Sequence, residues 1–330
     1  MKYNAFGRTG LKVSEIGFGT WGLGGDSYGP VDDQVSILAL KRARKLGINF
    51  YDTADLYGAG RAERILGQTF AGKREEIIIT SKVGNLPHKE FFMPQDFSEA
   101  HIRNGLEASL SRLQTDYIDI YLLHSPDLNT LNWEECLATL RSLKQAGKIR
   151  AFGVSARSPR DAKVAILEHD IEIVEVNFNL IDQRAIEEGL IKLCEERAVA
   201  LIARTPLCFG YLSGRLTGDE AFVGEDHRAK WPKAQLKRWA SAPQLFRGLG
   251  DAHGWSLSTL AIKFCISFPG VATVIPGMMN IAEVEENARV SELKALGPSD
   301  IERAYGIYKE HDFFDNTIKQ KAIQAEKGLS

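Results

Sequence analysis

The order of hydrophobic and polar positions along the chain predicts eight β-strands that alternate with helices. Short, almost continuously apolar runs, such as Ile77-Ile78-Ile79, are typical of a parallel sheet that helices cover on its outer face. The predicted strands are residues 15–20, 48–54, 77–83, 117–125, 149–155, 173–179, 199–205 and 271–277. Apolar positions spaced three and four apart predict helices over residues 31–46, 62–70, 98–113, 132–146, 158–169, 184–197, 256–268 and 281–293.

Residues at the ends of the predicted helices support these boundaries. Ser98 precedes a first turn that carries a carboxylate, and Ser158 is an N-cap followed by proline at the first helical position. Gly47 and Gly147 stand where helices are expected to stop. Eight strand-then-helix units in one chain predict a single α/β domain over residues 1–330, a (β/α)8 TIM barrel. A doubly wound open sheet is the alternative.

Three segments fall outside the eight units. Residues 1–14 hold two short apolar pieces on either side of a turn, which predicts an N-terminal β-hairpin. An insertion from about residue 210 to 254, rich in Gly, Trp, Arg and Lys, follows the seventh strand. We therefore expect it to overhang the C-terminal face, which carries the chemistry in such barrels. A tail after Pro298 carries a further helix.

Composition and charge exclude several classes of partner. The chain has 330 residues, of which 44% are hydrophobic and 25% charged, as is usual for a soluble globular protein. A formal net charge of -2 offers no basic field to nucleic acid or anionic lipid. The sequence shows neither an apolar run long enough to span a membrane nor a secretory leader, so a cytoplasmic location is expected. Four scattered cysteines, Cys136, Cys194, Cys208 and Cys265, predict neither disulfides nor a metal site.

Polar residues follow four successive predicted strands at the points where the strands end. Asp52 and Tyr57 follow the second strand, Lys82 the third, His124 the fourth and Ser155 the fifth. A lysine at the end of an apolar strand is costly unless it is paired, so Asp52 is its expected partner. Taken singly, these residues are ordinary structural ones, and only their joint placement at one mouth favours a site.

The predicted group suits carbonyl chemistry without a metal. Lys82, held as a cation, would make the Tyr57 hydroxyl more acidic than a free phenol, whose pKa is about 10. A phenol that exchanges a proton, beside the imidazole of His124 that orients a carbonyl oxygen, suits reduction by a hydride donor. Aromatic residues are also expected on loops above the mouth, and Trp21 is expected to line a substrate pocket; the others are Phe91, Phe92, Trp231 and Trp239.

The chain resembles the aldo-keto reductases over nearly its whole length. The most specific part is Gly47-Ile48-Asn49-Phe50-Tyr51-Asp52-Thr53-Ala54-Asp55-Leu56-Tyr57-Gly58, supported by Ile79-Thr80-Ser81-Lys82 and Leu122-Leu123-His124. The resemblance implies that Tyr57 is the general acid/base, that Lys82 and Asp52 tune it, and that His124 positions the substrate carbonyl. It also implies a nicotinamide nucleotide, NADP(H) or NAD(H), that lies across the barrel mouth without a Rossmann domain.

The same resemblance implies where the nucleotide binds. The implied cofactor contacts are Ser155, Glu175, Arg204, Pro206, Leu207, Leu212, Gly214, Arg215, Gly277, Met279, Glu283, Glu286 and Asn287. Several positions depart from the family pattern: Ala156 stands where Asn is usual, Glu175 where Gln is usual, and Arg204 where many members have an aromatic residue.

Glu283 bears on the choice between NADP(H) and NAD(H). Family members that prefer NADP(H) usually offer Arg or Lys to the 2'-phosphate at positions filled here by Gly277, Met279 or Glu283. A phosphate needs charge-assisted donors, and Glu283 would repel it. NAD(H), or the use of both, is therefore favoured more than in the family at large, with Arg215 and Arg289 as the cations that would support NADP(H).

Two classes of function follow from these features. The first is an oxidoreductase that interconverts a small aldehyde or ketone with its alcohol, including sugar-like substrates; an NAD-dependent aldose dehydrogenase is an alternative within this class. The second is a nucleotide-binding regulatory subunit with little turnover, because potassium-channel β subunits are similar to the family. A metal-dependent barrel hydrolase is disfavoured because the sequence lacks a multi-His/Asp cluster at the strand ends.

Overall fold

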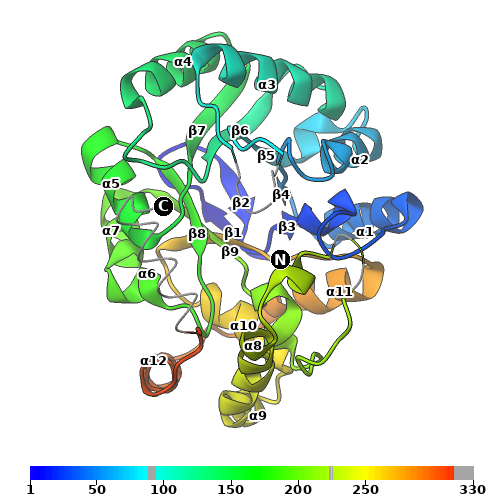
Figure 1. Ribbon diagram of the computed structural model, residues 1–330, viewed down its shortest axis with the longest axis vertical. Helices are drawn as coiled ribbons and strands as arrows, with labels where there is room; N and C mark the ends of the chain where they lie inside the picture. Colours follow the sequence, from blue (N-terminus) through cyan, green and yellow to red (C-terminus); the bar gives the residue numbers. More distant parts are fainter. Residues whose placement is uncertain (88–93, 223, 225, 316–330) are drawn as a thin grey trace.

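The computed structural model describes residues 1–87, 94–222, 224 and 226–315, and its centre is a parallel eight-stranded barrel (Figure 1). Neighbouring strands follow one another in chain order, which confirms the predicted (β/α)8 barrel and excludes the doubly wound sheet. Each strand falls inside its predicted apolar run. The strands are β3 (Phe18–Gly19), β4 (Phe50–Asp52), β5 (Ile78–Val83), β6 (Ile118–His124), β7 (Ile149–Ser155), β8 (Ile173–Asn177), β9 (Ala200–Arg204) and β10 (Val271–Ile275).

The barrel closes at a seam between its first strand, β3, and its last, β10. Isolated parallel bridges join Ile16 to Val274 and Gly19 to Gly277. Gly17, Gly19 and Gly22 have the spacing of a dinucleotide-binding turn, G-x-G-x-x-G. A Cβ at Gly19 would lie 2.9 Å from the carbonyl oxygen of Ile275 across the seam. Close approach of the two strands therefore accounts for Gly19.

Helices surround the barrel and begin and end largely where the sequence predicts. Ser98 and Ser158 each accept a hydrogen bond from a backbone N–H of the first turn, and Gly47 and Gly147 take left-handed φ values of 90° and 72° after helices. The helix predicted over residues 184–197 is divided at Gly189. The helices are α1 (Asp33–Lys45), α2 (Arg61–Thr69), α3 (Glu99–Leu113), α4 (Trp133–Gln145), α5 (Pro159–His169), α6 (Arg184–Glu187), α7 (Leu190–Arg197), α10 (Leu257–Cys265) and α11 (Ile281–Arg289).

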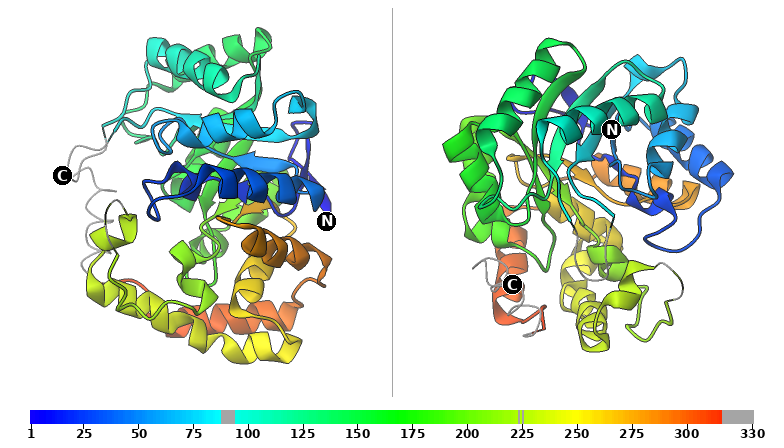
Figure 2. Two further views of the ribbon diagram at one scale, coloured as in Figure 1. Left: turned by 90° about the vertical axis from the view of Figure 1, so that its right-hand side faces the viewer. Right: turned by 45° about the horizontal axis from the view of Figure 1, so that its top comes forward.

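The predicted N-terminal hairpin is confirmed and closes one end of the barrel. Strands β1 (Tyr3–Ala5) and β2 (Lys12–Ser14) pair antiparallel, and Figure 2 shows them at the end of the barrel opposite the long loops. Phe6 and Val13 belong to the buried cluster that fills the barrel interior with Phe50 and Ile78. The active face is therefore the opposite, C-terminal end of the strands.

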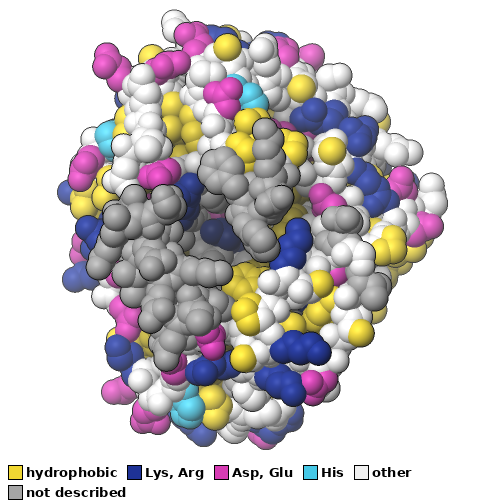
Figure 3. Space-filling view, viewed as in Figure 1, with side chains coloured by type: hydrophobic (Ala, Val, Ile, Leu, Met, Phe, Trp, Pro, Cys, Tyr) yellow, Lys and Arg dark blue, Asp and Glu magenta, His cyan; other side chains and the backbone are white. Residues whose placement is uncertain are grey.

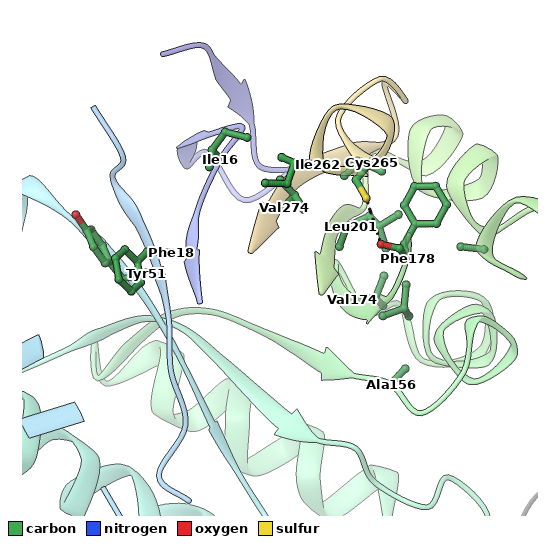
Figure 4. Close-up of a cluster of buried hydrophobic side chains, with 14 of the residues drawn as sticks. Ile16, Phe18, Tyr51, Ala156, Val174, Phe178, Leu201, Ile262, Cys265 and Val274 are labelled. Carbon is green, nitrogen blue, oxygen red and sulfur yellow. Dashed lines mark hydrogen bonds between the residues drawn. The ribbon is translucent and has the colours of Figure 1, made fainter. Parts of the chain in front are cut away.

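A larger apolar cluster lies between the sheet and the helices. Figure 4 shows part of it, including Phe18 beside Tyr51 and a contact from the Cys265 thiol to the carbonyl oxygen of Phe178. The four cysteines of the chain are all buried and unpaired, as the sequence predicts. Both layers of core hold the strand ends in fixed positions at the mouth.

The insertion after β9 contains helices that the sequence pattern does not reveal. It includes the short 3-10 helices η3 (Cys208–Ser213) and η4 (His227–Lys230), then α8 (Lys233–Leu245) and α9 (Arg247–His253). The predicted tail helix is α12 (Pro298–Glu310), which lies beside α8 and α9 (Figure 2). Within the described residues of the insertion, the part around η3 and η4 reaches the barrel mouth, where His227 and Trp231 line a cavity.

Candidate active site

Four predicted residues meet at the C-terminal ends of β4, β5 and β6. Lys82 Nζ donates to both carboxylate oxygens of Asp52 at 2.7 Å and lies 3.4 Å from Tyr57 Oη. The rings of Tyr57 and His124 lie edge to face with their centroids 6.1 Å apart. The structure therefore brings the predicted acid, amine, phenol and imidazole into one group.

The loop that carries Tyr57 is held against the loop that follows β3. The backbone N–H of Gly58 donates to Asp26 Oδ2 at 3.0 Å. Gly58 has a φ of 59°, and a Cβ there would lie 2.3 Å from the carbonyl oxygen of Gly24. Only glycine fits this approach, so the backbone next to Tyr57 is fixed by contacts on both sides.

Burial and charge set the protonation of Lys82 and its neighbours. Burial alone would lower the pKa of Lys82, but Asp52 and Glu175 together raise that pKa above its usual value, so the amine is a cation. Burial and Glu175 raise the pKa of Asp52, against the opposing effect of Lys82. Burial also raises the pKa of Tyr57 well above that of a free phenol, and Lys82 opposes this only in part.

The sequence-based prediction of an acidic Tyr57 is therefore wrong for the net pKa, although the contribution of Lys82 has the predicted sign. The reason is that the phenol is buried, and removing it from water disfavours the phenolate more than one ammonium favours it. At neutral pH Tyr57 is a protonated hydroxyl held 3.4 Å from a cation.

His124 is neutral in this environment. Burial, with the nearby cations Lys82 and Arg204, lowers the pKa of His124 well below its usual value. Its Nδ1 is buried and has no hydrogen-bond partner within the described part of the chain. A neutral imidazole at the cavity can donate one N–H to an oxygen of a bound molecule.

A cavity of about 1270 Å³ opens above this group. Figure 3 shows the same face as Figure 1, hollowed near its centre with hydrophobic and cationic side chains around the hollow. Asp52, Tyr57 and His124 line the cavity, while Lys82 is fully buried beneath them. Its size and mixed lining suit a small molecule of cofactor size.

Aromatic side chains form one wall of the cavity. Trp21 lines it as predicted, and its ring centroid lies 4.5 Å from His227, 5.4 Å from Tyr28 and 6.2 Å from Phe209. Trp231 also lines the cavity. Of the other aromatic residues expected above the mouth, Trp239 is buried in the core of the insertion, and Phe91 and Phe92 lie outside the described residues.

Most of the residues expected to bind a nucleotide line the same cavity. These are Glu175, Arg204, Pro206, Leu207, Arg215, Gly277, Met279, Glu283, Glu286 and Asn287. Three others lie behind the lining. Ser155 donates to Glu175 Oε1 at 2.9 Å, the side chain of Leu212 is buried in the core, and Gly214 ends η3. Ser155 therefore fixes the position of Glu175, which lines the cavity.

The residues at the ends of β8 and β9 fit a carboxamide. Glu175 Oε2 and Arg204 Nε are both buried and have no hydrogen-bond partner among the described residues. One is an acceptor and the other a donor, and an amide needs both. Burying such groups without partners is costly, so a ligand amide that satisfies both fits this position.

Comparison with known proteins identifies the family. The model of the Aldo/keto reductase family matches residues 15–309. The chain belongs to the aldo/keto reductase family. It is 32% identical to aldo-keto reductase YhdN of Bacillus subtilis, over 88% of this chain and 89% of the relative. It is 30% identical to L-galactose dehydrogenase of Arabidopsis thaliana, over 90% of each. Glycerol dehydrogenase AKR11B4 of Gluconobacter oxydans superimposes with a TM-score of 0.80 at 28% identity, over 95% and 97% of the two chains.

The far end of the cavity in this aldo/keto reductase is negatively charged. Glu283 Oε2 accepts from the backbone N–H of Met279 at 2.7 Å, and Oε1 accepts from Asn280 Nδ2 at 3.0 Å. Glu283 thus holds the start of α11, where helix N–H groups would otherwise attract an anion. Arg215 Nη2 lies 2.8 Å from Glu286 Oε2, so its charge is already paired.

Asp55 is a further cavity residue of this aldo/keto reductase that the sequence reasoning missed. Burial and Glu63 raise the pKa of Asp55 to about 7, and Arg112 opposes them. Its Oδ1 is buried without a hydrogen-bond partner among the described side chains and backbone. Asp55 lies between Asp52 and Tyr57 in the sequence, and nothing in the local pattern distinguishes it from a solvated loop residue.

His227 and Tyr28 were also missed, because their position depends on the insertion. No feature of the sequence around His227 marks it as a cavity residue. In the structure its backbone N–H and its Nδ1 both contact the carbonyl oxygen of Ser27. This contact brings η4 over the loop after β3.

None of the helices in the described ranges has the length and apolar character needed to cross a bilayer, and those ranges hold no cluster of His, Cys, Asp or Glu arranged for a metal.

Proposed function

We propose that this aldo/keto reductase transfers a hydride between a nicotinamide nucleotide and a small aldehyde or ketone, or the corresponding alcohol, with Tyr57 as general acid/base. The observation that carries the proposal is the buried Lys82 ammonium, 2.7 Å from Asp52 and 3.4 Å from Tyr57 Oη, beside a neutral His124. This group provides a proton donor and an oxygen-binding N–H at one wall of the cavity.

Each residue has a defined part in the proposed reaction. The nicotinamide, when bound, supplies or accepts the hydride. His124 donates an N–H to the substrate oxygen, and Tyr57 Oη gives that oxygen a proton during reduction. Because burial raises the pKa of Tyr57, the phenol is protonated at neutral pH and ready to act as the acid. Lys82 stabilises the phenolate that remains, and Asp52 fixes the position of Lys82.

The cavity walls support a sugar-like or polyol substrate. The aromatic wall formed by Trp21, Tyr28 and Phe209 offers flat surfaces for the apolar faces of a sugar ring, and Asn85 and Asp26 add polar groups to the lining. Two relatives are named as dehydrogenases of L-galactose and of glycerol. An NAD-dependent aldose dehydrogenase is therefore the form of the proposal that we favour, with Glu283 disfavouring the 2'-phosphate of NADP(H).

Replacing Tyr57 with Phe tests the proposed acid/base. The substitution removes only Oη, whose 3.4 Å contact with Lys82 is long for a hydrogen bond and contributes little to stability. We expect kcat for an aromatic aldehyde and for a sugar alcohol to fall by about 10²- to 10⁴-fold, while nicotinamide binding and the melting temperature change little. Tyr121→Phe is the matched control, because Tyr121 is buried and its hydroxyl has no partner in the described structure.

Two results would contradict this proposal. Unchanged turnover in Tyr57→Phe would show that the phenol is not the acid/base. Tight nucleotide binding by the wild type with no turnover of any carbonyl or alcohol in a broad panel would instead support the regulatory subunit considered from the sequence.

A further inference from the structure

Glu175 brings a second carboxylate to Lys82 from the far side of the barrel. Its Oε2 lies 3.6 Å from Lys82 Nζ, although β8 and β5 are not neighbouring strands. Glu175 is 1% exposed, and Ser155 on β7 fixes its other oxygen at 2.9 Å. Arg204 Nε on β9 lies 3.7 Å from the same oxygen, Oε1. The carboxylate is therefore built into the cavity wall and is not a mobile surface group.

Groups from every strand around Glu175 set its charge balance. Asp52 on β4, Lys82 on β5 and Arg204 on β9 lie beside it. His124 on β6 lies near Lys82 and Arg204, and the hydroxyl of Tyr57 is 3.4 Å from Lys82 Nζ. His124 and Tyr57 are neutral at pH 7. Two cations and two carboxylates remain, so a neutral side chain at Glu175 would leave the buried group with one fewer acid to balance the cations.

We propose that Glu175 makes this cavity favour the oxidised, positively charged nicotinamide over the reduced, neutral one. This inference rests on the function proposed above. The adenosine and phosphates are the same in both forms, so only groups near the nicotinamide can distinguish them. Glu175 lines the cavity, and its Oε2 is buried there without a hydrogen-bond partner among the described residues, so its carboxylate would interact with the charge of the oxidised ring. Glu175 is thus a specificity residue for redox form, and it favours alcohol oxidation.

The test compares the dissociation constants of NAD⁺ and NADH, measured by titration without any substrate. For Glu175→Gln we expect the preference for NAD⁺, expressed as the ratio of the two constants, to fall by about tenfold. Measurements between about pH 6 and pH 9 are needed because burial and Glu175 raise the pKa of Asp52, so replacing Glu175 changes the titration of Asp52. Circular dichroism and thermal melting confirm that the isosteric variant is folded.

A second variant has the opposite expected sign. Arg204→Met removes a cation from the same group, so it should increase the preference for NAD⁺ where Glu175→Gln decreases it. Glu283→Gln is the control for charge alone. It makes the same change at the other end of the cavity, 2.7 Å from the Met279 N–H, and should affect both redox forms equally.

The outcomes separate this inference from the proposed function. A ratio for Glu175→Gln within about twofold of the wild type at every pH would overturn the inference, as would a shift of Arg204→Met in the same direction as Glu175→Gln. If the wild type binds neither NAD⁺ nor NADH nor their phosphorylated forms, the proposed function itself is wrong.

Discussion

Glu283 allows the cofactor preference to be predicted with a magnitude. Its carboxylate lies at the start of α11 and accepts the Met279 N–H at 2.7 Å. The 2'-phosphate of NADP(H) carries a charge of about -1.5 to -2. Placed about 5 Å from Glu283, such a charge is repelled by about 1.5 kcal/mol at the dielectric constant of water and by about 3 kcal/mol at a constant of about 40. We therefore expect NADH to bind about 10- to 100-fold more tightly than NADPH.

The assay is a fluorescence titration of the wild type and of Glu283→Gln with each reduced nucleotide. The variant should lose most of the preference through tighter NADPH binding, with little change for NADH. Glu285→Gln is the matched control: Glu285 lies on the same helix but pairs with Arg42, and it is outside the lining of the large cavity. A wild type that already prefers NADPH, or an unchanged ratio in Glu283→Gln, would refute the reasoning.

Two further predictions concern stability. Lys82→Met leaves Asp52 and Glu175 buried without their cation, so the free energy of unfolding measured in urea should fall by about 3–5 kcal/mol. The decrease should be larger than in the control Lys263→Met, which removes a buried lysine that is hydrogen-bonded to a backbone carbonyl. Asp55 has a folded pKa of about 7, above an unfolded value of about 4, so the folded state binds the extra proton and wild-type stability should fall as pH rises from about 4 to about 7. Asp55→Asn should lack this loss and be more stable than the wild type at about pH 8; an identical pH dependence in both would refute the assignment.

The sequence predicts the barrel and the meeting of Asp52, Tyr57, Lys82 and His124 because both depend on local rules. Strand and helix periods identify each unit, and parallel strands necessarily bring their C-terminal ends to one face. The contact between Glu175 and Lys82 is different. It joins β8 to β5 through the barrel interior, and no spacing along the chain specifies that distance.

The insertion after β9 shows a second reason why sequence prediction stops short. Helix α8 contains Pro243 and begins after Pro232, so its pattern looks like a loop. Its stability comes from tertiary contacts, including the hydrogen bond from Gln235 to Phe313 O. The net pKa of Tyr57 was mispredicted for a related reason, because the charge of Lys82 can be read from the motif but the depth of burial cannot.

The seam between β3 and β10 gives a bound nucleotide a mechanical role. The first and last strands of the barrel are joined there by isolated bridges, and the loops that leave them carry Trp21 and Met279 to the same cavity. A ligand that contacts both loops would hold the first and last strands together at this seam. Filling the cavity would then slow hydrogen exchange at the backbone N–H groups of Gly17 and Gly19. These groups bond across the seam, to the carbonyl oxygens of Val274 and Pro276, just before the loop that leads to α11.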